Sequence, residues 1–221
     1  MMAFRLPMTF RHVLLMLALV LAAWVSPPLA GGAAEPVSGA AAQAVVKGFA
    51  DEGVSLLEDR GASPAARAER FRELLKKYFA TDAIARWVLG RYWNQLDAQQ
   101  RVDYQSLFED LVVYGYVKRF GEYTGERLRI VRTIADSDAQ ATVFSEIDRP
   151  AGGQPVRVDW RVGGRDGVYL ITDVVVENVS LSQTWRSDFS ATIRQSGGIN
   201  GLLDTLRVRT AQLKADLGVS R

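Results

Sequence analysis

The sequence predicts an α+β fold in which helices, then strands, then helices follow one another within one domain. Apolar residues recur with a helical period from about residue 40 to residue 120 and again after residue 180. Between these stretches, after Gly125, apolar and polar residues alternate for about fifty residues, as in strands. Because the helices and strands are segregated along the chain, we expect a twisted antiparallel sheet of four or slightly more strands packed against several helices.

The first 34 residues have the layout of a secretory signal peptide. Arg5 and Arg11 precede an uncharged apolar run over residues 13–25, and small residues stand before Glu35. A helix of that length spans only about 20 Å, which is too short for a hydrocarbon core of about 30 Å. We therefore expect residues 1–34 to be cleaved and residues 35–221 to form a single domain in the periplasm. The 187 residues that remain (221 less 34) are enough for one core and too few for two ordinary domains.

The first four predicted helices have recognisable ends. The first covers residues 40–58 and ends before Gly61, and the second begins at Ser63-Pro64, an N-cap followed by proline at the first helical position. The third is short, with Thr81 as its predicted cap and Gly90 at its end. Asp97 is the predicted cap of a long fourth helix over residues 98–120.

Four strands and two further helices are expected in the second half of the chain. The strands begin around Leu128, Ala141, Val156 and Val168, with turns at residues 150–153 and 163–167. Residues 168–177 are apolar on both faces, which is typical of a central strand. A helix follows Ser180 or Ser182, and after a break at residues 197–198 a last helix ends the chain.

The residue composition excludes several kinds of chemistry. There is no Cys, and the single His, His12, lies in the predicted leader, so thiol chemistry, His-based catalysis and the usual metal sites are not expected. No cofactor is predicted. The mature chain has 25 basic and 25 acidic residues after Arg5 and Arg11 are set aside, and this balance gives no reason to expect nucleic acid as a partner.

Two polar patterns allow a functional or a structural interpretation. Arg157 and Arg161 flank Asp159 on one strand face. Together with Arg127 and Arg129, this face is either an anion site or a solvated face with cross-strand ion pairs. Asp173 and Glu177 lie four residues apart, so on one strand they would share a face, where they could act as acid and base or simply pair with arginines.

The long fourth helix is apolar over most of its circumference. A surface helix usually has an apolar stripe little more than 100° wide, so this helix either lies at the centre of the core or contacts an apolar ligand. Gly115 in its middle costs about 1 kcal/mol relative to Ala. We expect it either to let another backbone approach or to leave room for a ligand.

A series of short motifs, in this order and spacing, resembles one known family. They are Gly90-Arg91-Tyr92-Trp93, Gln99-Gln100-Arg101, Phe108, Leu111-Val112, Glu122-Tyr123, the strand ending Asp173 to Leu181, Arg186-Ser187-Asp188-Phe189 and Gly197 to Leu203. Together they resemble the MlaC or toluene-tolerance family of periplasmic phospholipid-binding proteins over about residues 40–210. Parts look closest to a branch associated with hopanoid lipids. Asn178 stands where the family generally has Gly, and Asn tolerates the left-handed backbone better than most residues.

The resemblance implies a fold similar to nuclear-transport-factor-like and cystatin-like folds, with an apolar pocket between sheet and helices for acyl chains. It also implies a carrier, not an enzyme, that takes phospholipid or a hopanoid-type lipid between two partners. These are an inner-membrane ABC transporter complex and an outer-membrane lipoprotein–porin complex. The alternatives are an enzyme that uses Asp173 and Glu177, and an interaction protein with no ligand.

Strand alternation and helical phase select candidates for the pocket lining. They are Phe108, Val112, Tyr116, Val158, Trp160, Val174, Phe189 and Leu206.

Overall fold

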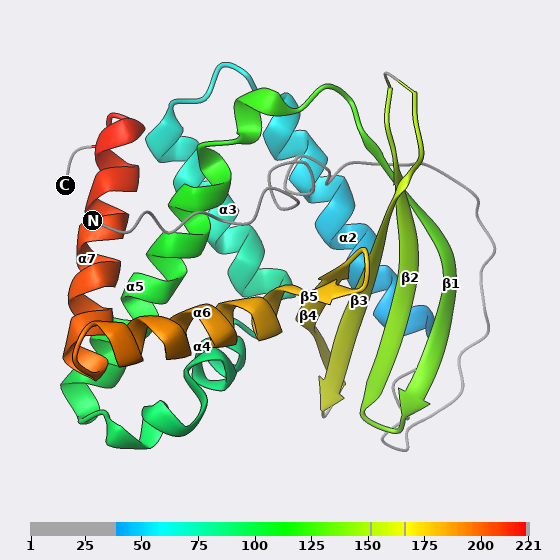
Figure 1. The fold of residues 1–221 in the computed structure, drawn as a ribbon. Helices are drawn as coiled ribbons and strands as arrows, with labels where there is room; N and C mark the ends of the chain where they lie inside the picture. The colour runs from blue at the N-terminus through cyan, green and yellow to red at the C-terminus, as the bar shows by residue number, and fades with distance from the viewer. Residues whose placement is uncertain (1–38, 151, 166, 220–221) are drawn as a thin grey trace.

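The computed structural model describes residues 39–150, 152–165 and 167–219, and it confirms the α+β fold. In this part of the chain, six α-helices and two short 3₁₀ helices accompany one antiparallel sheet, whose strand order is β1-β2-β3-β4-β5 (Figure 1). The predicted signal peptide lies outside the described residues. Within residues 39–150, 152–165 and 167–219, none of the helices could span a bilayer.

The first three helices lie where the sequence predicts them, with one difference at a cap. α2 (Gly39–Glu58) lies against the sheet, and α3 (Pro64–Tyr78) begins at Ser63, whose Oγ accepts the Ala66 N–H at 3.2 Å. α4 (Thr81–Leu89) has Ala80 rather than Thr81 as its N-cap. The reason is tertiary, because the Ala80 N–H donates to the carbonyl of Ile171 at 3.0 Å and so holds this segment on β4.

The 3₁₀ helix η1 (Gly90–Gln95) leads from α4 to α5 (Ala98–Val117), which packs against α3, α4 and α7. Asp97 and Gln100 form a capping box at its start. α5 ends three residues before the predicted Phe120, which instead opens a second 3₁₀ helix, η2 (Phe120–Glu122). No heavy atom would lie within 4 Å of a Cβ at Gly115, so no backbone approaches there.

The strands are β1 (Arg127–Ser137), β2 (Gln140–Asp148), β3 (Val156–Arg165), β4 (Val168–Val176) and the two-residue β5 (Val179–Ser180). β3 extends through Gly163, so the turn predicted at residues 163–167 is shorter than expected. β4 lies between β3 and β5 in the sheet, in agreement with the prediction of a central strand. Only Val175 and Val176 pair with β5, while a bridge from Phe79 and several helices cover the rest of β4.

A two-residue turn joins β4 to β5 and changes the position of Glu177. Glu177 and Asn178 both have positive φ, 47° and 67°, which is the backbone of a type I′ hairpin turn. Asn178 therefore adopts a left-handed conformation, which Gly and Asn tolerate better than most residues. Because Glu177 lies in this turn, it does not share a strand face with Asp173, and that expectation is wrong.

Two helices close the molecule: α6 (Leu181–Gln195), capped by Ser180, and α7 (Ile199–Asp216), which packs on α5 and α6. The buried apolar residues form two large clusters. One lies between the sheet and helices α2, α3 and α5, and the other joins α4, α5, α6 and α7. α5 contributes to both clusters, so the apolar character around its circumference follows from its position between them.

Candidate functional site

An apolar cavity lies between the sheet and the helices. Its volume is about 180 Å³, and the empty space in and around it, open solvent included, is about 1470 Å³. The lining comes from α2, α3, α4, α5, η2, β3, β4 and α6. It includes Phe49, Leu56, Leu57, Phe71, Leu75, Phe79, Ile84, Val88, Phe108, Val112, Tyr116, Phe120, Val158, Trp160, Val174, Val176, Leu181 and Trp185. A cavity with such walls favours an apolar occupant over water.

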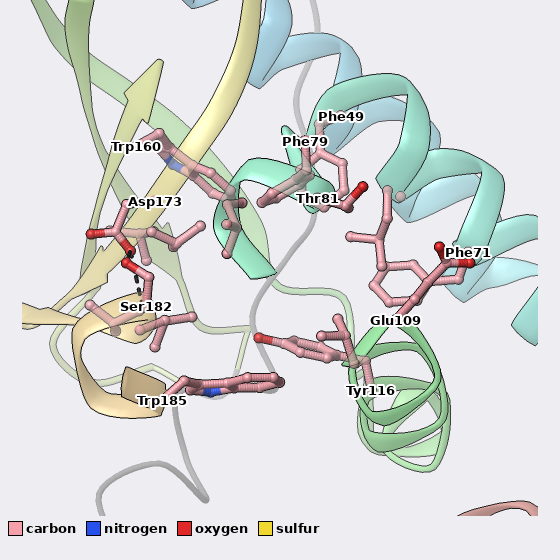
Figure 2. A pocket seen from close by; sticks show the side chains of 18 of the residues that line it. Phe49, Phe71, Phe79, Thr81, Glu109, Tyr116, Trp160, Asp173, Ser182 and Trp185 are labelled. Carbon is pink, nitrogen blue, oxygen red and sulfur yellow. Dashed lines mark hydrogen bonds between the residues drawn. The ribbon is translucent and has the colours of Figure 1, made fainter. Parts of the chain in front are cut away.

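On the sheet side, Trp160 presents its ring to the cavity with its polar atom already satisfied. The indole N–H donates to the Ser145 Oγ at 2.9 Å, and the Ser145 hydroxyl donates to the Val158 carbonyl at 2.7 Å. Both side chains are completely buried. The Trp160 ring stands edge-on to Phe49, with centroids 5.8 Å apart, and Phe49 meets Phe79 in the same way (Figure 2). The wall that results is apolar although it contains an indole and a serine.

On the helix side, Phe108, Val112 and Tyr116 follow one another at intervals of four residues and form one face of α5. Figure 2 shows the Tyr116 hydroxyl directed into the cavity, above the ring of Trp185. Burial raises the pKa of Tyr116 to about 12, and the positive charge of Arg119 offsets this only in part. The phenol is therefore neutral at physiological pH and adds no charge to the site.

Three charged residues reach the lining, and the two carboxylates are already paired. Asp173 accepts hydrogen bonds from the hydroxyls of Ser180 and Ser182, at 2.6 and 2.7 Å, at the start of α6. Glu109 accepts from Arg72 at 2.5 Å. Arg119, the third, has no ion pair with any carboxylate of the described residues.

Asp173 and Glu177, which the sequence analysis considers as an acid–base pair, have separate structural roles. Asp173 binds the N-terminus of α6 and contacts Arg161 at 3.3 Å, while Glu177 accepts the backbone N–H of Arg157 at 2.6 Å. In the described part of the chain, no group of three or more His, Cys, Asp or Glu side chains could hold a metal ion.

The outer face of the sheet carries ion pairs in place of an open anion site. Arg129 pairs with Glu146, Arg157 lies 3.9 Å from Asp159, and Arg161 contacts Asp173. This arrangement corresponds to the solvated, cross-paired alternative.

Six of the eight candidate residues lie together at the cavity: Phe108, Val112, Tyr116, Val158, Trp160 and Val174. Phe189 and Leu206 lie instead in the cluster of α4, α5, α6 and α7, packed with residues such as Tyr104. Sequence reasoning missed the contribution of α2, α3 and α4, including Phe49 and Phe71. Their apolar stripes were visible, but a stripe has the same period whether it meets other side chains or an empty space.

Fold and site together define an α+β protein built around an apolar cavity between its sheet and its helices. The sequence relationship agrees, because a profile described as MlaC protein matches residues 49–208. The chain belongs to the MlaC family.

A solved structure shares the fold. It is described as the phospholipid-binding protein from Ralstonia solanacearum in complex with a phospholipid, at 1.53 Å resolution. The TM-score is 0.67 at 24% sequence identity, over 78% of this chain and 98% of that one. No curated protein sequence matches the chain.

Proposed function

We propose that this protein is a periplasmic lipid carrier that binds the acyl chains of a phospholipid in the cavity between α5 and the sheet. The observation that carries the proposal is the lining itself. Aromatic and aliphatic side chains from eight elements surround the cavity, while its buried polar groups, such as the Trp160 indole and Asp173, are satisfied within the protein. The family and the phospholipid in the Ralstonia solanacearum structure support the same ligand class.

Such a cavity lowers the cost of moving a lipid through water. Each CH₂ group taken from apolar surroundings into water costs about 0.8 kcal/mol, so a long acyl chain does not leave a bilayer at a useful rate without a carrier. The cavity continues into a wider cleft that is open to solvent, and we expect a complete lipid to occupy both. The tails then supply most of the affinity, and the head group remains near solvent.

The proposal also includes the partners between which the lipid is carried. A carrier that holds its cargo by burial needs a partner that stabilises an open conformation, because weak binding alone would lose the lipid to water. We propose that an inner-membrane ABC transporter complex and an outer-membrane lipoprotein–porin complex supply these two openings. The cargo is phospholipid, and a hopanoid-type lipid is the related candidate.

The test compares two substitutions on one helix. Val112→Arg places a charge in the cavity, whereas Val102→Arg places the same charge at a position of α5 that is 59% exposed. We expect native mass spectrometry of the wild type and of Val102→Arg to show co-purifying lipid, and Val112→Arg to have lost most of it while circular dichroism stays unchanged. A wild-type protein without lipid that also extracts none from phospholipid vesicles would refute the proposal.

A further inference from the structure

Helices α4 and α6 form one wall of the cavity, and a second groove lies on the outside of this wall. Ile84 and Val88 of α4 and Trp185 of α6 face the cavity, while neighbouring residues of the same helices line a separate groove on the outside. We name this surface the Arg–aromatic patch. It consists of Arg86, Trp87, Arg91, Tyr92, Trp93 and Arg186.

The arginines of the patch contact aromatic rings instead of carboxylates. The guanidinium of Arg186 lies 4.7 Å from the Trp87 ring centroid, and that of Arg86 lies 5.7 Å from Trp93. Arg91 lies 5.1 Å from the ring of Tyr92 and donates to its hydroxyl at 3.2 Å. None of these arginines has an ion pair within the described ranges. Stacking on a ring leaves most guanidinium N–H groups available for an anion.

Two of the acidic residues nearby are engaged elsewhere, and one is not. Asp97 caps α5, and Asp103 binds Arg207 and Gln99. Asp82 stands in the first turn of α4 and has no partner among the described residues. Two further arginines add to the positive charge: Arg101 lies 5.4 Å from the Trp93 ring, and Arg194 lowers the pKa of Tyr92 together with Arg91.

Gly90 and Arg186 hold the two helices of the patch together. Gly90 ends α4 with a positive φ of 58°, and a Cβ there would lie 2.9 Å from the Arg186 guanidinium. Arg186 in turn donates to the carbonyl of Trp87 at 3.1 Å. Trp87 is 44% exposed. A large apolar ring at the surface does not contribute to the folded core. The patch is thus a built surface of exposed tryptophan and unpaired arginine.

We propose that the Arg–aromatic patch docks the protein on an anionic lipid surface. Phosphate groups are complementary to the unpaired guanidinium groups, and Trp and Tyr rings are amphipathic groups that favour the bilayer interface. Docking there brings the α4–α6 wall of the cavity against the bilayer. The inference goes beyond cargo binding, because it concerns where the carrier meets a membrane and not what the cavity holds.

The test is co-sedimentation of the purified protein with phosphatidylcholine vesicles that contain increasing fractions of phosphatidylglycerol. We expect binding that rises with phosphatidylglycerol and falls with added salt. Each arginine near an anionic surface contributes about fivefold to partitioning, so Arg86→Gln with Arg91→Gln should weaken it roughly thirtyfold. Trp87→Ala should weaken the part of binding that remains at high salt.

The charge-matched control is Arg127→Gln with Arg149→Gln, two exposed arginines at the β1 and β2 side of the sheet that have no ion pair among the described residues. This control should bind vesicles about as the wild type does, apart from a small effect of net charge. If the control and the patch variant lose binding equally, or if the wild type ignores phosphatidylglycerol, the proposal is overturned. The latter result would favour an acidic protein as the partner of the patch.

Cargo content by native mass spectrometry is measured in parallel. Patch variants that keep their bound lipid but no longer co-sediment with the vesicles support the docking proposal. Patch variants that lose their lipid but still bind the vesicles overturn it.

Discussion

Ser145 offers the sharpest test of how the cavity wall is built, because its buried hydroxyl links the Trp160 indole to the Val158 carbonyl. Ser145→Ala removes the acceptor of the indole N–H and the donor to the Val158 carbonyl, at a position with no exposed surface. A buried polar group left without its partner costs about 1–3 kcal/mol. We therefore expect the free energy of unfolding to fall by about 2 kcal/mol, or roughly 4–8 °C in Tm.

The assay is urea unfolding of lipid-free protein, because a bound lipid would add its own stabilisation to the folded state. Ser187→Ala, at an exposed position of α6, is the control and should change stability by less than about 0.5 kcal/mol. In the double variant with Trp160→Phe, donor and acceptor are both absent, so the combined loss should be about 1 kcal/mol smaller than the sum of the single losses. A Ser145→Ala protein as stable as the wild type, or strict additivity in the double variant, would refute this reasoning.

Three further predictions test other parts of the structure. Gly115→Ala should stabilise the protein by about 1 kcal/mol in urea unfolding, since a methyl group there meets no atom within 4 Å; a loss of stability would show that the site is more crowded. Asp173→Asn with Glu177→Gln should lower the unfolding temperature, through weaker contacts at the start of α6 and in the β4–β5 turn, but leave co-purified lipid in place; loss of lipid in a folded variant would contradict this. Burial raises the pKa of Asp188. The folded state therefore keeps the Asp188 proton to a higher pH than the unfolded state does. As a result, the free energy of unfolding falls as pH rises from the pKa of Asp188 in the unfolded state through its pKa in the folded state. Asp188→Asn should therefore be more stable than the wild type at neutral pH, and the difference should shrink toward pH ~4 in thermal melts; an equal difference at both pH values would argue against it.

Local signals predicted the helices because their causes lie close together in the chain. Ser63-Pro64 and Asp97 mark helix starts by hydrogen bonds that span three residues, and these bonds are present. The cap of α4 was displaced by one residue because the segment at Ala80 binds Ile171, which is distant in sequence. β5 was not predicted for a related reason, since a two-residue strand has no period and exists only through its pairing with β4.

The candidate lining was predictable in part. Phe108, Val112 and Tyr116 share one face of α5, and Val158 and Trp160 share one face of β3, so helical phase and strand alternation placed them correctly relative to each other. The same pattern could not separate them from Phe189 and Leu206, whose apolar stripes meet neighbouring helices.

The sequence alone therefore determined the order of helices and strands, most helix ends, the absence of Cys from the chain and of His after His12, and the resemblance to the MlaC family. These properties depend on residue identity and on contacts within a few positions. Only the tertiary structure decided which apolar faces enclose an empty space, which carboxylates are paired, and that arginines and aromatic rings gather beside α4 and α6. The physical reason is that a cavity or a patch depends on the distances between elements far apart in the chain, and an apolar stripe has the same period whether neighbouring atoms fill the space in front of it or not.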